Sequence, residues 1–196
     1  MSAKNVAVLT NDLQYDLVEL TPARIAAVGE ATPEFQLFLD GMRAAGANIV
    51  HLQLIILPED PRGLYEGRRL AVKGTKGAEI ITDFLDPSDI VLEKNKDSGF
   101  YETALDETLK RLGVDTLVVT GMQTQICVQT TAADAFFRGY NVWVPEDCVI
   151  SARPEDKHRS LQWMDSYCAT ISSSHKILEL LEKGEALPLK TGVVAY

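Results

Sequence analysis

Three residues that can take part in nucleophilic and proton-transfer chemistry each stand just after a short apolar segment that predicts a strand. They are Asp12, Lys94 and Cys127. In an open α/β sheet the carboxyl ends of the strands form the edge at which ligands bind. We therefore expect the three side chains to converge at that edge. Three reactive residue types at three strand ends indicate function more strongly than any one of them alone.

Together these residue types suit covalent hydrolysis of an amide-like carbonyl. The Cys127 sulfur would attack the carbonyl carbon while Asp12 accepts the thiol proton. Backbone N–H groups at the start of the following helix would hold the oxyanion. Asp12 would then protonate the leaving amine or ammonia and activate the water that releases the acyl group. Lys94, close to both, would favour the ionised forms of Asp12 and Cys127.

The segment around Cys127 predicts a thiol of lowered pKa. The apolar run 117–119 ends at Gly121, and helical spacing of apolar residues begins at Val128. Cys127 is therefore expected at or just inside the N-terminus of a helix. The positive end of the helix dipole lowers the pKa of a thiol placed there and favours the thiolate.

Each of the three residues also has a purely structural interpretation. A free cysteine such as Cys127 is most often a small core hydrophobe. Asp12 could satisfy the N–H groups of a turn, and Lys94 could be an exposed lysine at a strand end. Their joint occurrence at predicted strand ends is what favours catalysis.

Composition indicates one globular domain spanning residues 1–196. Hydrophobic residues make up 46% of the chain and charged residues 24%, which is typical of folded proteins. The formal net charge of -9 argues against nonspecific binding to nucleic acid or to anionic membranes, because both need basic surfaces. No apolar run approaches the ~20 residues of a membrane span.

Cysteine usage points to a reducing compartment. The cysteines are Cys127, Cys148 and Cys168, an odd number without CxxC spacing. This fits the cytoplasm better than a disulfide framework or a zinc site. We expect a cytoplasmic protein in which Cys148 and Cys168 are buried bystanders.

Apolar runs and helical spacing predict strands and helices that alternate along the chain. The predicted strands are residues 5–10, 48–56, 89–93, 117–119, 141–144 and 169–172. The predicted helices run from the Thr32-Pro33 pair to Gly46, from Thr103 to Leu112, onward from Cys127, and over residues 154–164 and 175–183. Residues 15–32 have a loop-like composition. The tail 184–196 ends in Val193-Val194-Ala195-Tyr196, which could join a subunit interface.

This alternation predicts a single-domain, three-layer α/β/α fold. Its six-stranded, mostly parallel sheet would be covered on both faces and joined by right-handed crossovers. The doubly wound, Rossmann-like default is the strand order 3-2-1-4-5-6. That order places the ends of strands one, three and four, and hence the three reactive residues, along one edge.

The long segment 58–77 is rich in Pro, Gly, Arg and Lys and has no clear periodicity. It is too long for a bare connector, so it predicts a functional loop that could cover a site. Its cations could attract an anionic substrate, although a solvated surface loop accounts for most of these charges. The cations are Arg62, Arg68, Arg69, Lys73 and Lys76.

Several blocks of this sequence closely resemble the isochorismatase-like cysteine hydrolase superfamily. The blocks occur in the family's order and cover nearly the whole chain, from the first predicted strand to the last helix. They are Asp12-Leu13-Gln14, Gly74-Thr75-Lys76-Gly77-Ala78-Glu79, Lys94 through Ser98-Gly99-Phe100-Tyr101, Gly121 through Thr124 to Cys127-Val128, Asp134-Ala135 with Gly139-Tyr140, and Glu146-Asp147. The superfamily includes nicotinamidases, N-carbamoylsarcosine amidases, biuret and ureidoacrylate hydrolases, and isochorismatase.

The resemblance implies that Asp12, Lys94 and Cys127 are a catalytic triad. It also implies a non-proline cis peptide bond, which falls at Met122-Gln123. Such a bond would aim the backbone N–H of Gln123 alongside that of Cys127, and the two would form the oxyanion hole.

The resemblance further implies a small-molecule substrate and a homodimer or homotetramer. Gln14, Phe100 and Gln123 are expected to contact the substrate, although simple core packing accounts for Phe100 equally well. Subunit contact could supply further residues to the pocket, and the sequence does not locate them.

The chain departs from the family's metal-dependent members. Nicotinamidases hold a metal with an aspartate and two closely spaced histidines after the second strand. The only histidines here are His51, His158 and His175, and none has that spacing. We expect no metal and no other cofactor.

Three functions are compatible with the sequence. The first is a cysteine-dependent amidohydrolase that releases ammonia from a small amide or carbamoyl compound. The second keeps the fold and hydrolyses an enol ether, as isochorismatase does. The third is a non-catalytic, ligand-sensing member, and the intact Asp12, Lys94 and Cys127 argue against it.

Overall fold

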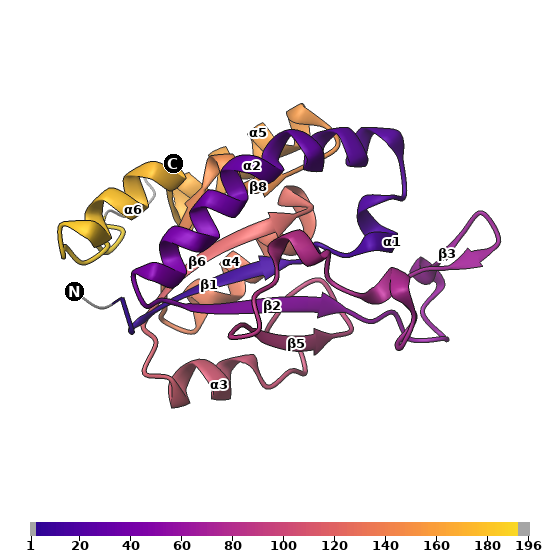
Figure 1. Cartoon of the computed structure of the whole chain (residues 1–196), viewed down its shortest axis with the longest axis horizontal. Helices are drawn as coiled ribbons and strands as arrows, with labels where there is room; N and C mark the ends of the chain where they lie inside the picture. Colours follow the sequence, from indigo (N-terminus) through magenta and orange to yellow (C-terminus); the bar gives the residue numbers. More distant parts are fainter. Residues whose placement is uncertain (1–2, 192–196) are drawn as a thin grey trace.

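The computed structural model describes residues 3–191 and centres on one parallel sheet (Figure 1). Its order is β5-β2-β1-β6-β7-β9, which confirms the predicted order 3-2-1-4-5-6. The short β8 pairs with the end of β6. The strands are β1 (Val6–Asn11), β2 (Asn48–Leu54), β5 (Ile90–Lys94), β6 (Thr116–Met122), β7 (Asn141–Pro145), β8 (Val149–Ile150) and β9 (Thr170–Ser172).

Helices cover both faces of the sheet, as the predicted three-layer fold requires (Figure 1). The helices are α1 (Tyr15–Val18), α2 (Pro22–Ala44), α3 (Leu105–Arg111), α4 (Gln129–Phe137), α5 (Pro154–Tyr167) and α6 (Ser174–Glu182). Helices α3, α4 and α5 pack on one face, while α2 and α6 pack on the other. None of the helices within residues 3–191 is long and apolar enough to cross a membrane.

The period-two alternation of the strands divides the core between the two faces. In β1, Ala7 and Leu9 face one hydrophobic cluster, while Val6 and Val8 face the other. Because both faces are covered, all six residues of β1 are buried. This double burial explains why the strands read as continuous apolar runs rather than as alternating ones.

The first long helix begins earlier than the sequence predicts. Helix α2 starts at Pro22, capped by the Thr21 side chain, and Pro33 lies inside it instead of at its start. The prediction was wrong because the same Thr-Pro signature occurs twice, and the earlier pair starts the helix. In the first half of α2 only Val28 is buried, so that half shows no apolar face to reveal it.

The long basic segment is ordered into short elements near the end of β2. It contains a 3-10 turn at Pro61–Gly63 and a two-stranded hairpin made of β3 (Leu64–Tyr65) and β4 (Arg68–Arg69). In Figure 1 this hairpin projects at the end of the molecule toward which β1, β2 and β5 point. The apolar tail at residues 193–196, expected to join an interface, lies outside the described residues.

At the ends of β1 and β6 the two backbones leave no space for a side chain at Gly121. Gly121 pairs with Asn11 in the parallel register and has a φ of 98°. A Cβ at Gly121 would lie 2.3 Å from the Asn11 carbonyl oxygen and 2.4 Å from its nitrogen. Both contacts are to backbone, so only glycine fits at this position.

We predict that Gly121→Ala destabilises the protein by about 3 kcal/mol or more, since a left-handed φ and a backbone clash act together. Gly113→Ala is the matched control, because Gly113 also has a positive φ but a Cβ there meets nothing within 4 Å. The free energy of unfolding of the control should fall by only about 1–2 kcal/mol. Urea unfolding measures both, and equal losses would show that the contact with Asn11 does not matter.

Candidate active site

The fold brings Asp12, Lys94 and Cys127 together at the carboxyl edge of the sheet. Asp12 directly follows β1, Lys94 ends β5, and Cys127 lies in the π-helical turn Thr124–Val128 that leads into α4. The Lys94 Nζ lies 3.0 Å from Asp12 Oδ1 and 3.1 Å from Asp12 Oδ2. Lys94 is 1% exposed and Asp12 is 2% exposed, so this is a fully buried ion pair.

The ammonium of Lys94 has enough acceptors to lie in the interior. Besides Asp12, its Nζ donates to the Lys96 carbonyl oxygen at 3.2 Å and to the Asp97 carbonyl oxygen at 3.0 Å. These partners match the three N–H groups of an ammonium. Burial acts against the charge, yet Asp12 and Cys127 together hold the pKa of Lys94 above its ordinary value.

Burial raises the pKa of Asp12, and the nearby Lys94 ammonium and Cys127 thiol only partly oppose this effect. Burial also raises the pKa of Cys127 well above its ordinary value, and the charge of Asp12 adds to the rise. The expected low thiol pKa is therefore wrong for the resting protein. Cys127 is 6% exposed, and its loss of solvation is the largest cause of the raised pKa.

This combination suits proton transfer that is coupled to bond formation. A carboxylate whose pKa is raised is a stronger base, and a thiol whose pKa is raised stays protonated until that base takes its proton. Asp12 and Cys127 are thus arranged so that the sulfur becomes nucleophilic only as the proton leaves. Lys94 holds the carboxylate from the side opposite to solvent.

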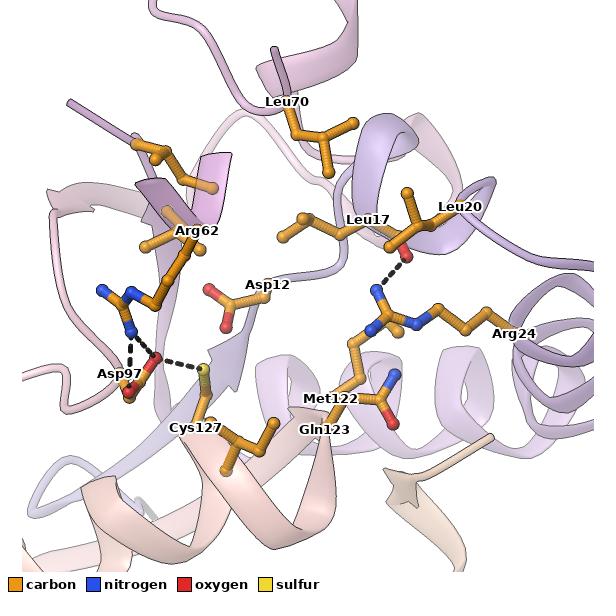
Figure 2. Close-up of a pocket in the computed structure, with 13 residues that line it drawn as sticks. Asp12, Leu17, Leu20, Arg24, Arg62, Leu70, Asp97, Met122, Gln123 and Cys127 are labelled. Atoms are coloured by element: carbon orange, nitrogen blue, oxygen red, sulfur yellow. Dashed lines mark hydrogen bonds and ion pairs between the residues drawn. The ribbon is translucent and has the colours of Figure 1, made fainter. Parts of the chain in front are cut away.

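A cavity of about 380 Å³ opens in front of Asp12 and Cys127 (Figure 2). Most of its wall is aliphatic, which suits a small ligand held by a few polar groups. The lining residues are Asp12, Leu17, Leu20, Arg24, Leu54, Ile56, Arg62, Leu70, Asp97, Met122, Gln123, Ile126 and Cys127. Lys94 lies behind Asp12 and is not part of the wall.

The Met122–Gln123 peptide bond is cis, and both residues line the cavity. The Gln123 side chain is 8% exposed, and its Oε1 accepts a hydrogen bond from the backbone N–H of Ala152 at 3.2 Å. This places Gln123 beside Cys127 in the same wall. The oxyanion-hole role of the Gln123 and Cys127 N–H groups stays a prediction.

Gln14 and Phe100 are not among the residues that line this cavity; their contact with the substrate stays a prediction. The Gln14 amide donates to the carbonyl oxygens of Leu54 and Ala78 and accepts from the Leu54 N–H at 2.7 Å. It ties the end of β2 to a loop and thereby supports Leu54 of the wall. Phe100 is buried in the core and stacks on Tyr140.

Asp97 also lies in the cavity wall, although no role was predicted for it from the sequence. Its Oδ1 lies 3.9 Å from the Cys127 sulfur, and its carboxylate pairs with the Arg62 guanidinium at 3.1 Å. Asp97 follows Lys94 within one of the family-like blocks, so its neighbourhood was recognisable even though its contact with Cys127 was not.

The cations of the segment 58–77 are occupied by protein partners. Arg62 pairs with Asp60 and Asp97, Arg68 with Asp16, Lys73 with Glu93, and Lys76 with Glu79, while Arg69 donates to the carbonyl oxygens of Leu57 and Asp60. Only Arg62 of this set lines the cavity. The other lining cation, Arg24, comes from α2, in a segment that the sequence predicted to be a loop.

No histidine is among the described residues that line the cavity. His51, in β2, is buried between the Thr10 hydroxyl at 2.6 Å and the Asp89 carboxylate at 2.9 Å. The residues at the end of β2 and just after it that line the cavity are Leu54 and Ile56. Within the described part of the chain, no three His, Cys, Asp or Glu side chains are grouped to hold a metal ion.

Residues 6–176 match the family described as the isochorismatase domain. The chain belongs to the isochorismatase family. An isochorismatase family protein from Desulfovibrio vulgaris has a similar structure, with a TM-score of 0.81 and 29% identity over 91% of this chain and 98% of that one. N-carbamoylsarcosine amidase from Thermoplasma acidophilum has a TM-score of 0.75 and 31% identity over 89% of this chain and 97% of that one.

Curated members of the isochorismatase family match over shorter stretches. The ureidoacrylate amidohydrolase RutB of Methylobacterium radiotolerans is 48% identical over 75 residues, which are 38% of this chain and 29% of RutB. Across three such relatives the match covers between 29% and 51% of the relative's length. These matches therefore support the family assignment and leave the activity to be argued from the site.

We predict that Asp12→Asn and Lys94→Met shift the pKa of Cys127 in opposite directions. The Asp12 charge raises this pKa and the Lys94 charge lowers it, so Asp12→Asn should speed alkylation of Cys127 at neutral pH and Lys94→Met should slow it. The pH dependence of iodoacetamide labelling, followed by mass spectrometry in a Cys148→Ala, Cys168→Ala background, measures the shift. Changes of the same sign in both variants would contradict this electrostatic account.

Proposed function

We propose that this isochorismatase-family chain is a cysteine-dependent hydrolase. It would cleave the C–N bond of a small amide or carbamoyl compound and release ammonia. The observation that carries the proposal is the buried Lys94–Asp12 pair, which presents a carboxylate of raised pKa to the same cavity as the Cys127 thiol. The printed activities of RutB and N-carbamoylsarcosine amidase, two similar proteins, lend support.

In the first step Asp12 accepts the proton of the Cys127 thiol as the sulfur attacks the carbonyl carbon. The C=O bond opens to an oxyanion, which the backbone N–H groups of Gln123 and Cys127 would hold. A single oxyanion donor of this kind typically contributes about 10²–10³ in kcat. The protonated Asp12 carboxyl remains beside the nitrogen that must leave.

In the second step the oxyanion collapses, the C–N bond breaks, and Asp12 gives its proton to the leaving nitrogen. Ammonia or an amine departs, and the acyl group stays on Cys127 as a thioester. Asp12, again a carboxylate, then takes a proton from water, whose oxygen attacks the thioester carbon. The thiolate that leaves recovers the proton from Asp12, so the resting state is restored.

Lys94 takes no proton in this scheme and acts as a positioning residue. Its ammonium keeps the Asp12 carboxylate in place through every change of charge on Asp12 and Cys127. The aliphatic wall limits the water around these charges, which strengthens their interaction.

The raised pKa of Asp12 favours a second candidate, the hydrolysis of an enol ether. A protonated Asp12 could donate to the terminal vinyl carbon, and water would then attack the resulting cationic carbon and return a proton to Asp12. The hemiketal so formed would collapse with cleavage of the ether C–O bond, its hydroxyl proton passing to the departing alcohol as the carbonyl product forms. This route does not need a covalent bond to Cys127. It therefore differs from amide hydrolysis in what happens when Cys127 is removed.

We predict that the wild type releases ammonia from one or more members of a panel of ureido, carbamoyl and carboxamide compounds, and that Cys127→Ala does not. A colorimetric ammonia assay reads this out, and mass spectrometry of Cys127→Ser, whose ester hydrolyses more slowly, should show an acylated protein. If the panel gives nothing and isochorismate is cleaved by both the wild type and Cys127→Ala but not by Asp12→Asn, the enol-ether route replaces the amidase proposal.

We also propose a homodimer or homotetramer, the assembly that the family resemblance implies. In support, α4 and α5 carry a cluster of mutually contacting aromatic rings in which Phe137 is 68% exposed. Exposed apolar clusters of this kind often mark contact surfaces. Light scattering should give a mass of more than one subunit per particle. Phe137→Glu should lower this mass toward that of the monomer. A monomeric wild type would contradict the proposal.

A further inference from the structure

Two arginines line the cavity in front of Cys127, and they differ in how they are paired. The Arg62 guanidinium contacts Asp60 at 2.9 Å and Asp97 at 3.1 Å, so its charge is neutralised within the protein. Arg24 has no carboxylate within ion-pair distance among residues 3–191. The hydrogen bond that its side chain makes with the described residues is to the Leu17 carbonyl oxygen, at 2.9 Å.

This single contact leaves most of the Arg24 guanidinium without an acceptor, since the group has five N–H donors. Arg24 is partly buried in the first turn of α2, against a mainly aliphatic wall. Burial lowers the pKa of Arg24, and no adjacent carboxylate offsets that loss of solvation. A partly desolvated cation facing a cavity favours an anion from outside the chain.

Gln123, on the same wall, has an amide N–H group that is enclosed by protein atoms and lacks an acceptor in the described part of the chain. Gln123 is more than nine-tenths buried, and its Nε2 has no hydrogen-bond partner within residues 3–191. Its Oε1 is held by the Ala152 N–H, which determines which way the amide faces. Figure 2 draws the Gln123 amide and the Arg24 guanidinium on one side of the cavity, with Arg62 and Asp97 on the other.

We propose that Arg24, with the Gln123 amide beside it, binds a carboxylate of the substrate, so that the substrates are small ureido or carbamoyl acids and not neutral amides. This inference rests on the proposed amidohydrolase function. The carboxylate would lie at Arg24, and the scissile carbonyl would lie at Cys127 and Asp12. A guanidinium suits this task because its planar fork can hold both oxygens of a carboxylate.

The charge of the whole molecule makes a local cation necessary for such a substrate. The chain carries a formal net charge of -9, so its long-range field repels an anion. The cavity itself contains two carboxylates, Asp12 and Asp97, and the basic side chains nearby are already paired. Arg24 is then the group that can hold an anion close to the nucleophile.

The test compares 3-ureidopropionate with its methyl ester, which lacks the negative charge and carries one additional methyl group. We expect the wild type to prefer the acid in kcat/KM, measured by ammonia release. Arg24→Gln should lower kcat/KM for the acid by about 10- to 100-fold, the range expected for a lost charged hydrogen bond, and mainly through KM. The ester should change by about twofold or less, and Arg24→Lys should recover part of the preference.

Arg111→Gln is the matched control. Arg111 is exposed at the end of α3, so this substitution removes the same charge far from the cavity. It should leave both substrates unchanged. Equal kcat/KM values for acid and ester, or an equal loss for both in Arg24→Gln, would overturn the carboxylate site while leaving the amidohydrolase proposal intact.

A binding measurement separates the two proposals if no ammonia is released. In Cys127→Ala, 3-ureidopropionate and N-carbamoylglycine are titrated by calorimetry, with and without Arg24→Gln. Binding that depends on Arg24 supports the carboxylate site even if hydrolysis fails. Absence of binding with Arg24 intact, or binding that Arg24→Gln does not weaken, overturns it.

Discussion

Lys94 and Asp12 bury opposite charges at the ends of β5 and β1, two strands that β2 separates in the sheet. An unpaired charge in this position would be destabilising, so each side chain compensates the burial of the other. The chain after β5 therefore folds back to offer the Lys96 and Asp97 carbonyl oxygens to the ammonium. The position of Asp97 in the cavity is a consequence of that requirement.

The same pair sets the chemistry that Cys127 can perform. A buried thiol beside a carboxylate is held in its protonated form, so the nucleophile is not exposed as a thiolate in the resting protein. In the proposed mechanism, activation depends on Asp12 accepting the proton at the moment of attack. A hydrogen-bond chain keeps the parts in register: the Thr131 hydroxyl of α4 donates to Asn11 of β1 and accepts from the Gly99 N–H.

The charges around the cavity are distributed unevenly. Carboxylates and cations of the basic segment neutralise one another, whereas Arg24 enters from α2 without a carboxylate partner in the described part of the chain. Of the two cations in the cavity wall, Arg62 is paired with Asp60 and Asp97, whereas no carboxylate among the described residues neutralises Arg24. The proposed catalytic residues and the proposed carboxylate site thus come from different segments: Asp12 and Lys94 from strand ends, and Arg24 from the start of α2.

The sequence by itself determined the sheet order and the convergence of Asp12, Lys94 and Cys127, because apolar strands alternating with helices allow few topologies and parallel strands bring their carboxyl ends to one edge. Only the tertiary structure decided the protonation of Cys127, the removal of Phe100 from the cavity and the isolation of Arg24. These properties depend on burial and on partners distant in sequence. A local pattern, such as a cysteine near a helix start, indicates the effect of the helix dipole on the thiol pKa. It gives no information on the burial that raises this pKa.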